Sequence, residues 1–353
     1  MWIEIKDDIF QAEEVENMNF LLRIIFERPK GSNNTRANIY VDISKVLNSP
    51  LFNSLSSTDQ GLIEDSLKLF SYEEDVQVKY TISNDNNNLN LEEALVFFRE
   101  PLWVVLENSA NDSNFIKSII YHFDDEKKYL IDCLNNRWID FANAGGSGAK
   151  NQIKAKLSSF DNLGLIYGSE ANKYYRGFVL LDSDNDFPGQ GIKEDYNTLI
   201  SYLEDNRIEW HILEKRSMEN YMPDEVLFDV RNKKSNPIRA NNKDCVDWIN
   251  VYEHLNDVQK NYLKYSGQKL FIDLAPAAQN IYHNQLGANY SILNKGISYR
   301  DNETQGIEED ERRFKNSFPR LYISSMLVNK VSLNKRCGTD ELQRIFTQIK
   351  SML

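Results

Sequence analysis

The most constraining stretch of the sequence is an apolar run that ends in three closely spaced aspartates, Phe178-Val-Leu-Leu-Asp-Ser-Asp-Asn-Asp186. The apolar part has the length and composition of a strand buried on both faces, as in a parallel sheet. In open α/β sheets, chemistry is placed at the carboxyl edge, where the strands end. Asp182, Asp184 and Asp186 would repel one another there by roughly 1 kcal/mol or more per pair at an effective dielectric of about 20. A hard divalent cation such as Mg²⁺ would offset that repulsion, because it takes carboxylate oxygens.

Three further runs have the same strand-like character, at 102–106, 138–141 and 208–213. The first run leads directly into Glu107, and the last is followed by the segment Glu219-Asn220-Tyr221. Helix-length segments lie between the runs, at about 112–121, 148–158 and 194–206. This alternation over residues 100–222 predicts a parallel sheet with helices covering its faces.

The rest of the chain divides around this segment into two further regions. We interpret 1–88 as a small α+β region, 89–224 as the sheet domain and 225–353 as a mainly helical region, so the predicted fold class is α/β. The N-terminal region is expected to hold strands at 20–26, 37–41 and 76–80 and a helix near 58–70. Asn90 and Glu93 have the spacing of a capping box before a helix. Beyond residue 222 we expect a loop at 231–243, an exposed connector at 301–313, and helices near 244–265, 275–285 and 338–352.

Composition and charge restrict the class of protein. Hydrophobic residues make up 41% and charged residues 27%, which is ordinary for a globular chain. No apolar run approaches the roughly 18 residues of a membrane span, the N-terminus lacks a signal-peptide pattern, and the three cysteines are far apart. We therefore expect a cytoplasmic protein with reduced thiols and no membrane partner. The net charge of −12 argues against a passive DNA binder, but not against a nuclease with an acidic metal site.

Residues 312–353 differ from this average, with nine lysines and arginines against two acids. Such a basic segment suits contact with phosphates or an acidic partner, and equally suits a solvated helix face. Lys215 and Arg216 follow the last predicted strand and precede Glu219. They are candidates for stabilising charge on a phosphate, or are surface cations beside Glu214.

Rival motifs fit less well. A calcium-binding EF-hand loop starting at Asp182 would need Gly and Glu where Phe187 and Lys193 stand. A solvated acidic turn stays as the alternative. The turn Gly145-Gly-Ser-Gly148 fits neither a nucleophile elbow nor a P-loop, and is left as a tight turn whose amides would suit a phosphate. The four histidines are scattered without ligand spacing, which makes zinc improbable.

Taken in order, Glu107 after a strand, the Gly-Gly turn, the Asp182-x-Asp184 pair and the closing Glu219-Asn-Tyr resemble a TOPRIM domain. The resemblance covers about 100–222 and is nearest to the nuclease branch related to the OLD family and to TOPRIM proteins of anti-phage systems. That branch usually has Glu-Gly-x-x-Asp after the first strand. Here Asn111 stands at the expected place and the acid, Asp112, follows it, which leaves open which of the two fills the second-ligand position.

The resemblance implies a Mg²⁺- or Mn²⁺-dependent nuclease acting on DNA or RNA. By it, Glu107, Asp182 and Asp184 would hold one ion, and Glu219 with Asp184 or Asp186 a second. Two such ions stabilise an in-line phosphoryl displacement. The implied catalytic residues are Glu107, Asp182, Asp184 and Glu219, with Lys215 added from its position, and the implied metal ligands are Glu107, Asp112, Asp182, Asp184, Asp186 and Glu219.

The resemblance also implies a partner for the nuclease. OLD proteins carry an ATPase domain that this chain lacks, so an ATPase would be a separate partner of a defence effector.

Two other hypotheses stay open beside the nuclease. The altered spacing at Asn111 and Asp112 favours the first alternative, a catalytically inactive TOPRIM binding or regulatory module. The second is a primase- or topoisomerase-like enzyme. Homo-oligomerisation stays open in all three.

Overall fold

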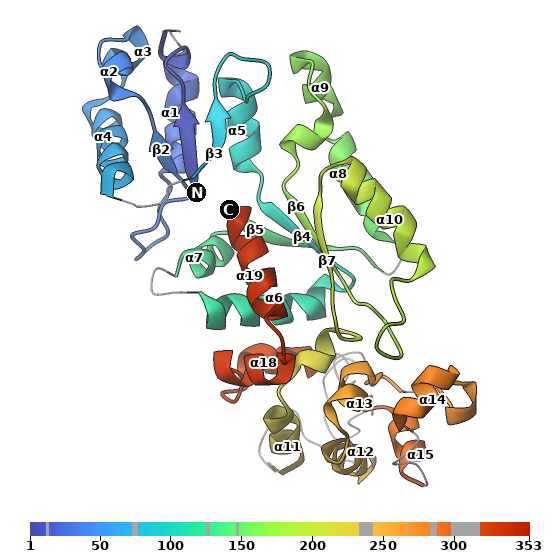
Figure 1. The fold of residues 1–353 in the computed structure, drawn as a ribbon. Helices are drawn as coiled ribbons and strands as arrows, with labels where there is room; N and C mark the ends of the chain where they lie inside the picture. Colours follow the sequence, from blue (N-terminus) through green and yellow to red (C-terminus); the bar gives the residue numbers. More distant parts are fainter. Residues whose placement is uncertain are drawn as a thin grey trace, which may run out of the picture.

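The computed structural model describes residues 1–353 except 12–13, 73–76, 125–127, 146–147, 233–242, 268, 283–287 and 298–317. Two parallel sheets with flanking helices are built from the described residues, which confirms the α/β class (Figure 1). The N-terminal region does not have the expected α+β character, because its three strands are parallel as well. The N-terminal sheet has the strand order β2-β1-β3, and the central sheet the order β5-β4-β6-β7. No helix in the described part of the chain is both long and apolar enough to cross a membrane.

The central sheet consists of the four strands expected from the apolar runs, β4 (Leu102–Leu106), β5 (Ile139–Asn143), β6 (Gly177–Leu181) and β7 (Glu209–Ile212). All adjacent pairs are parallel, and β6 is buried along its whole length. The chain leaves β4 to form β5 on one side and returns to form β6 on the other. The carboxyl ends of β4 and β6 therefore flank a topological switch point, where open α/β sheets bind ligands.

Side chains of the central strands alternate between two cores. On β4, Leu102, Val104 and Leu106 join one core, whereas Val105 joins the other. The first core contains α6 (Ser109–Phe123) and α7 (Tyr129–Asn135), and the second contains α8 (Ala149–Ser158) and α10 (Glu194–Asp205). Because strand side chains alternate with a period of two, the apolar runs are buried on both faces by helices on both sides.

The C-terminal helices continue the first core. Phe115 of α6 packs against Tyr322 with ring centroids 5.3 Å apart, and Phe123 lies 6.3 Å from Phe346. The core cluster is continuous from the central sheet into this region. Its helices are α11 (Asp224–Asn232), α12 (Lys243–Glu253), α13 (Asp257–Tyr262), α14 (Pro276–Tyr282), α15 (Ala288–Lys295), α17 (Leu321–Ser324), α18 (Lys330–Cys337) and α19 (Glu341–Ser351).

The N-terminal sheet has a separate core. Its strands are β1 (Trp2–Ile5), β2 (Asn38–Tyr40) and β3 (Val78–Ile82), and its main helices are α1 (Val15–Ile25), α4 (Ser57–Tyr72) and α5 (Leu91–Arg99). The capping box at the start of α5 is confirmed, with Asn90 and Glu93 exchanging two hydrogen bonds of 2.8 Å. The apolar side chains of α5 pack in this core.

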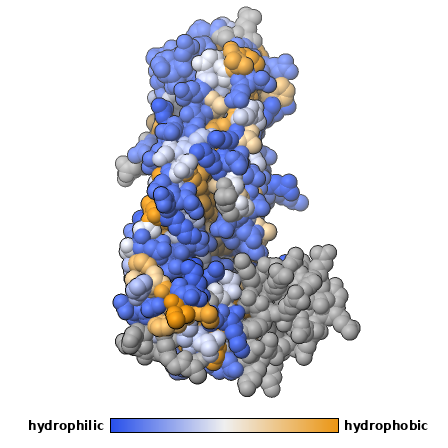
Figure 2. Space-filling model, turned by 90° about the vertical axis from the view of Figure 1, so that its right-hand side faces the viewer, coloured by the Kyte–Doolittle hydropathy of each residue, from blue (hydrophilic) through white to orange (hydrophobic). Residues whose placement is uncertain are grey.

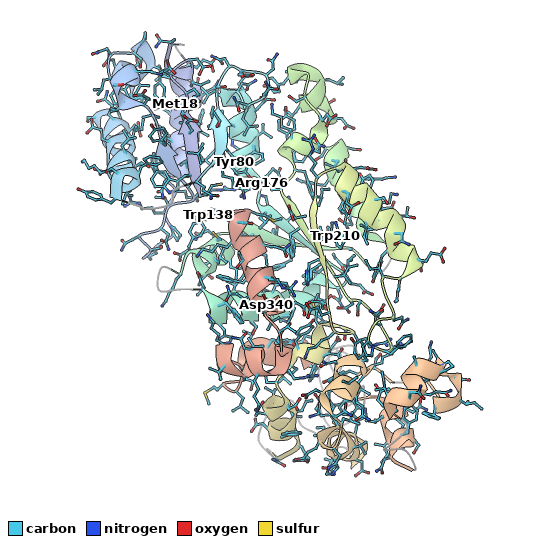
Figure 3. The ribbon with its side chains drawn as sticks, in the orientation of Figure 1. Met18, Tyr80, Trp138, Arg176, Trp210 and Asp340 are labelled. Carbon is cyan, nitrogen blue, oxygen red and sulfur yellow. The ribbon has the colours of Figure 1, made fainter. Side chains whose placement is uncertain are left out.

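Polar and aromatic contacts join the N-terminal part to the central sheet (Figure 3). The buried Arg176 stacks over Phe97 of α5, with 5.4 Å between its guanidinium carbon and the ring centroid. Trp138, just before β5, donates to Glu27 at 3.2 Å and lies under Arg36. On the face shown in Figure 2 the surface is mostly hydrophilic, and apolar residues gather in small separate patches.

Several local predictions need correction. Residues 20–25 belong to α1 and Phe26 is its C-cap, so this run is not a strand: Met18, Leu21, Leu22 and Ile25 recur at helical spacing and all face the core. The helix expected at 244–265 is broken between α12 and α13, where Asn256 caps the second helix. The predicted loop 231–243 begins inside α11. Its residues 233–242 and the connector 301–313 lie outside the described residues.

Candidate functional site

A cavity of about 630 Å³ lies at the carboxyl edge of the central sheet. Its sheet side is lined by residues that follow β4, β5 and β6 and by the loop after β7. The opposite wall comes from the C-terminal region and includes Lys264, Tyr265, Ile297 and Phe318. Five carboxylates line this cavity, which we call the acidic pocket: Glu107, Asp112, Asp182, Asp184 and Glu219.

Strand register brings the first two acids together. Val105 of β4 pairs with Val179 of β6, so continuing the register puts Glu107 level with Leu181. Asp182 is the next residue, and it emerges at the switch point beside Glu107. The backbone N–H of Gly145 donates to the carbonyl of Glu107 at 2.9 Å, which holds the end of β5 against the same edge.

A tight turn directs the two aspartates after β6. The buried Ser183 donates to the carbonyl of Lys215 at 2.8 Å, and the N–H of Asp184 donates to the carbonyl of Arg216 at 2.8 Å. Asp184 has φ +53°, in the left-handed region, which aspartate tolerates better than most residues. Such conformations are held by their surroundings and cluster at functional sites. The turn lets Asp182 and Asp184 face the pocket while Ser183 points away from it.

Glu219 is positioned by a firmly anchored 3-10 turn, η4 (Met218–Tyr221). The N–H of Met218 donates to Asp182 at 3.2 Å, which ties this turn to the end of β6. The buried Asn220 donates to the carbonyls of Lys260 and Leu263 at 2.7 and 2.9 Å. Asn220 therefore has a structural role, and Glu219 is the member of the Glu-Asn-Tyr segment that faces the pocket.

Glu341 helps to position the site, although no sequence pattern predicted this role. It is fully buried at the start of α19 and accepts hydrogen bonds from the Tyr221 hydroxyl and, at 2.7 Å, from the N–H of Glu214. His211 of β7 lies 2.8 Å from the same carboxylate. Its partners are more than 100 residues away in sequence, so no local pattern marks it. Glu341 fixes the loop that carries Arg216 and Glu219.

The crowding of the acids affects the protonation of Asp182. Burial raises the pKa of Asp182 well above its usual range, and the neighbouring carboxylates raise this pKa further. These neighbours are Glu219, Asp112, Glu107 and Asp184. Crowded carboxylates favour the protonated form of the most buried one. A bound cation would reverse this preference.

The donor set of the pocket suits Mg²⁺ or Mn²⁺, which prefer oxygen ligands. Besides the five carboxylates, the amide side chains of Asn108, Asn111 and Asn143 line the cavity. Asn111 and Asp112, the two candidates for the second-ligand position, both line the cavity. The residues present therefore fit one or two hard divalent cations by chemistry.

The acids nevertheless make other contacts in this structure. Lys193 lies 2.5 Å from Asp184, and Asp112 accepts the N–H of Asn108 at 2.8 Å. Within the described residues, no three histidine, cysteine or acidic side chains stand close enough to hold a metal ion as they are placed. Ion binding would require rotation of side chains such as Asp184 away from Lys193.

Two predicted site residues do not line the acidic pocket. Lys215 is buried and donates to the carbonyl of Arg336, and burial lowers the pKa of Lys215 to about 7. Asp186 pairs with Arg216 and lies 4.0 Å from Lys269. Arg216, the neighbour of Lys215, does line the pocket. The alternation of side chains along the loop places one cation inside and the other in the core.

The remaining candidates have mixed outcomes. Gly145 lines the pocket with φ +47°, whereas residues 146–147 lie outside the described residues. Of the basic C-terminal segment, residues 312, 313 and 315 also lie outside them. Lys335 and Arg344 form ion pairs with Glu225 and Glu214, which agrees with a solvated helix face. The thiols of all three cysteines are free and buried.

Comparison with known proteins adds no relative: no family model, no curated protein and no solved structure matches the chain. Functional inference for this chain therefore starts from the geometry of the acidic pocket.

Proposed function

We propose that this chain is a TOPRIM-like nuclease, which hydrolyses phosphodiester bonds in DNA or RNA with the help of Mg²⁺ or Mn²⁺. One observation carries the proposal: five carboxylates from the segments that follow β4, β6 and β7 line one cavity at the switch point of a parallel sheet. Folding alone does not favour such crowding, because like charges repel. A bound divalent cation would offset this repulsion among the carboxylates.

Within this proposal the residues divide by position. Glu107, Asp182, Asp184 and Glu219 would hold the ions, with Asn111 and Asp112 beside them. When bound, divalent cations neutralise charge on the phosphate and activate water for attack. Arg216 and Lys264 also line the pocket, where their positive charge would orient the phosphate and stabilise the charge that develops on it.

A cleavage panel tests the proposal. Plasmid, linear DNA and tRNA are incubated with Mn²⁺ and wild-type protein, Asp184→Ala or Asp8→Asn, the last altering an acid of the N-terminal sheet. We expect cutting of at least one substrate by wild type and Asp8→Asn and none by Asp184→Ala. Cutting that is equal in all three preparations, or absent from all, would count against the nuclease.

A second candidate, an inactive TOPRIM binding or regulatory module, has one observation in its favour. Lys193 already neutralises Asp184, and Asp112 is engaged by the Asn108 backbone. These contacts are compatible with a site that no longer binds ions. Heat released on titration with Mn²⁺ supports the nuclease, and the absence of heat supports the module.

The other expectations follow from the resemblance. A separate ATPase partner and a defence role against phage are proposed on that ground alone. A topoisomerase-like reaction needs a tyrosine nucleophile. Among the residues described as lining the pocket the one tyrosine is Tyr265, which is buried and lies 3.1 Å from the Tyr252 hydroxyl. Hydrolysis is therefore better supported than a tyrosine-linked reaction.

A further inference from the structure

A second cavity, of about 390 Å³, lies between α6 and β5. We call it the α6–β5 groove. Its walls include the basic residues Lys117 and Arg137, the aromatic residues Tyr121 and Phe141, and one acid, Asp140. None of them belongs to the acidic pocket. The mixture of cations and aromatic rings is typical of surfaces that bind single-stranded nucleic acid, where bases stack and phosphates pair with cations.

The same two elements, α6 and β5, line both the groove and the acidic pocket. On α6, Asp112 lines the acidic pocket and Lys117 lines the groove. On β5, Asn143 lines the acidic pocket and Phe141 lines the groove. The helical rise separates the first pair by about 7.5 Å along the axis, and the strand rise separates the second pair by about 7 Å. The two cavities therefore follow one another along both α6 and β5.

The side chains that line the groove are exposed to solvent or fixed by neighbouring groups. Tyr121 is 42% exposed, although it is a large aromatic residue. Lys117 lies 5.3 Å from the centroid of the Phe141 ring and 3.3 Å from Ser113 Oγ, so its charge is fixed over the groove. Arg137 is exposed, and its backbone has φ +58° in the turn that leads to β5. An exposed ring in a groove that also holds two cations offers a stacking surface.

The position of β5 leaves the groove open. In the described part of the central sheet, β5 is an edge strand that pairs with β4 alone. An open edge also accepts a strand from another protein, so two occupants compete. Charge favours a polyanion, because the groove is lined by two cations and one acid among the described residues.

We propose that the α6–β5 groove binds single-stranded nucleic acid next to the segment that enters the acidic pocket. Tyr121 stacks on a base, and Lys117 and Arg137 contact the adjoining phosphates. A duplex hides its base faces, so the groove favours single strands over duplexes. The role in guiding a substrate rests on the proposed nuclease function, whereas the binding itself does not.

The test measures binding without cutting. Fluorescence anisotropy follows labelled single-stranded and duplex oligonucleotides in EDTA, over a range of salt. The variants are Lys117→Gln/Arg137→Gln and Tyr121→Ala. The matched control is Lys150→Gln/Lys154→Gln on α8, which packs in the core on the other face of the sheet. Circular dichroism checks the fold, and light scattering checks the oligomeric state.

Loss of two phosphate contacts should reduce the slope of log affinity against log salt by about 1.4 for single strands. Tyr121→Ala should weaken single-strand binding roughly five- to hundred-fold and duplex binding less, and the control should stay within about twofold. Groove variants that bind like the control, a wild type that binds no oligonucleotide, or a change confined to the oligomeric state would each overturn the proposal. Groove-dependent binding without any cutting would uphold the groove and reject the nuclease, and normal cutting with unaltered binding would do the reverse.

Discussion

The two sheets of this chain share a parallel architecture and differ at their carboxyl edges. In each sheet the first strand lies inside and later strands flank it. At the carboxyl edge of the N-terminal sheet, a cavity of about 220 Å³ is lined by Glu14, Asn84 and Glu92 among others. The carboxyl edge of the central sheet has the acidic pocket of about 630 Å³. Asp8, which follows β1, accepts the N–H groups of Asn84 and Ile9 at 2.7 and 3.0 Å.

This difference shows what turns a strand end into a candidate site. At the N-terminal edge, Asp8 uses both of its oxygens to satisfy backbone donors, which is a structural task. At the carboxyl edge of the central sheet, five acids converge on one cavity, and burial together with the other four carboxylates raises the pKa of Asp182. Parallel topology supplies the position, and an excess of carboxylates supplies the chemistry.

The largest expected effect is on the cleavage rate, when an aspartate is replaced at one sheet or at the other. We expect Asp182→Asn to reduce metal-dependent cleavage at least a hundred-fold, because a lost ligand weakens both ion binding and charge stabilisation. Asp8→Asn makes the same chemical change at the other sheet and should leave the rate within about twofold. Initial rates on the preferred substrate of the cleavage panel measure both. Equal losses in the two variants would show that folding, and not the site, was damaged.

A smaller effect should separate the two neighbouring cations of the central edge. We expect Arg216→Gln to lower the cleavage rate about tenfold, because its charge lines the pocket. Lys215→Met should change this rate less than threefold, because its ammonium lies in the core against the carbonyl of Arg336. Steady-state kinetics on one substrate compares them. The reverse order would restore Lys215 as the catalytic cation.

The same buried lysine should make stability depend on pH. The pKa of Lys215 is lowered to about 7 in the folded protein, against about 10.4 when unfolded. Between these values the unfolded state binds more protons, so stability rises with pH. From pH 7 to pH 9 we expect wild type to gain on the order of 2 kcal/mol relative to Lys215→Met. Urea unfolding at both pH values measures this, and parallel curves would contradict the burial of an ionisable lysine.

The smallest effect should have opposite signs at the two sheets. In EDTA at pH 7, Asp182→Asn should stabilise the protein by about 1 kcal/mol, because it removes a carboxyl group whose charged form is disfavoured by burial and by the neighbouring carboxylates. Asp8→Asn should destabilise it by about 1 kcal/mol, because a backbone donor loses its acceptor. The raised pKa of Asp182 means that its stabilising contribution is present below the unfolded pKa and is lost as pH rises towards the folded pKa. The gain from Asp182→Asn should therefore shrink at pH 4 in urea unfolding.

The sequence predicted the parts of the fold that depend on local pattern. Wholly apolar runs located the four central strands, and the acids next to them located Glu107, Asp182 and Asp184 at one edge. The strand expected at 20–26 is a helix because its apolar run is equally compatible with a helical stripe. The run 20–26 alone could not decide between them, because Met18, which extends the helical stripe, lies before it.

Long-range contacts account for what the sequence did not predict. The wall formed by Lys264, Ile297 and Phe318, and the buried Glu341 beneath Tyr221, come from regions without a chemical motif. Lys215 and Arg216 are adjacent and similar in type, so only tertiary packing distinguishes the buried cation from the one in the pocket.

Titration calorimetry with Mn²⁺ tests the central claim most directly, because it needs neither a substrate nor a partner. Wild type and Asp8→Asn should release or absorb heat with a stoichiometry of one or two ions, and Asp182→Asn should show weakened or no binding. A wild type that binds no Mn²⁺, or an Asp182→Asn variant that binds as wild type does, would contradict the assignment of the acidic pocket as a cation site.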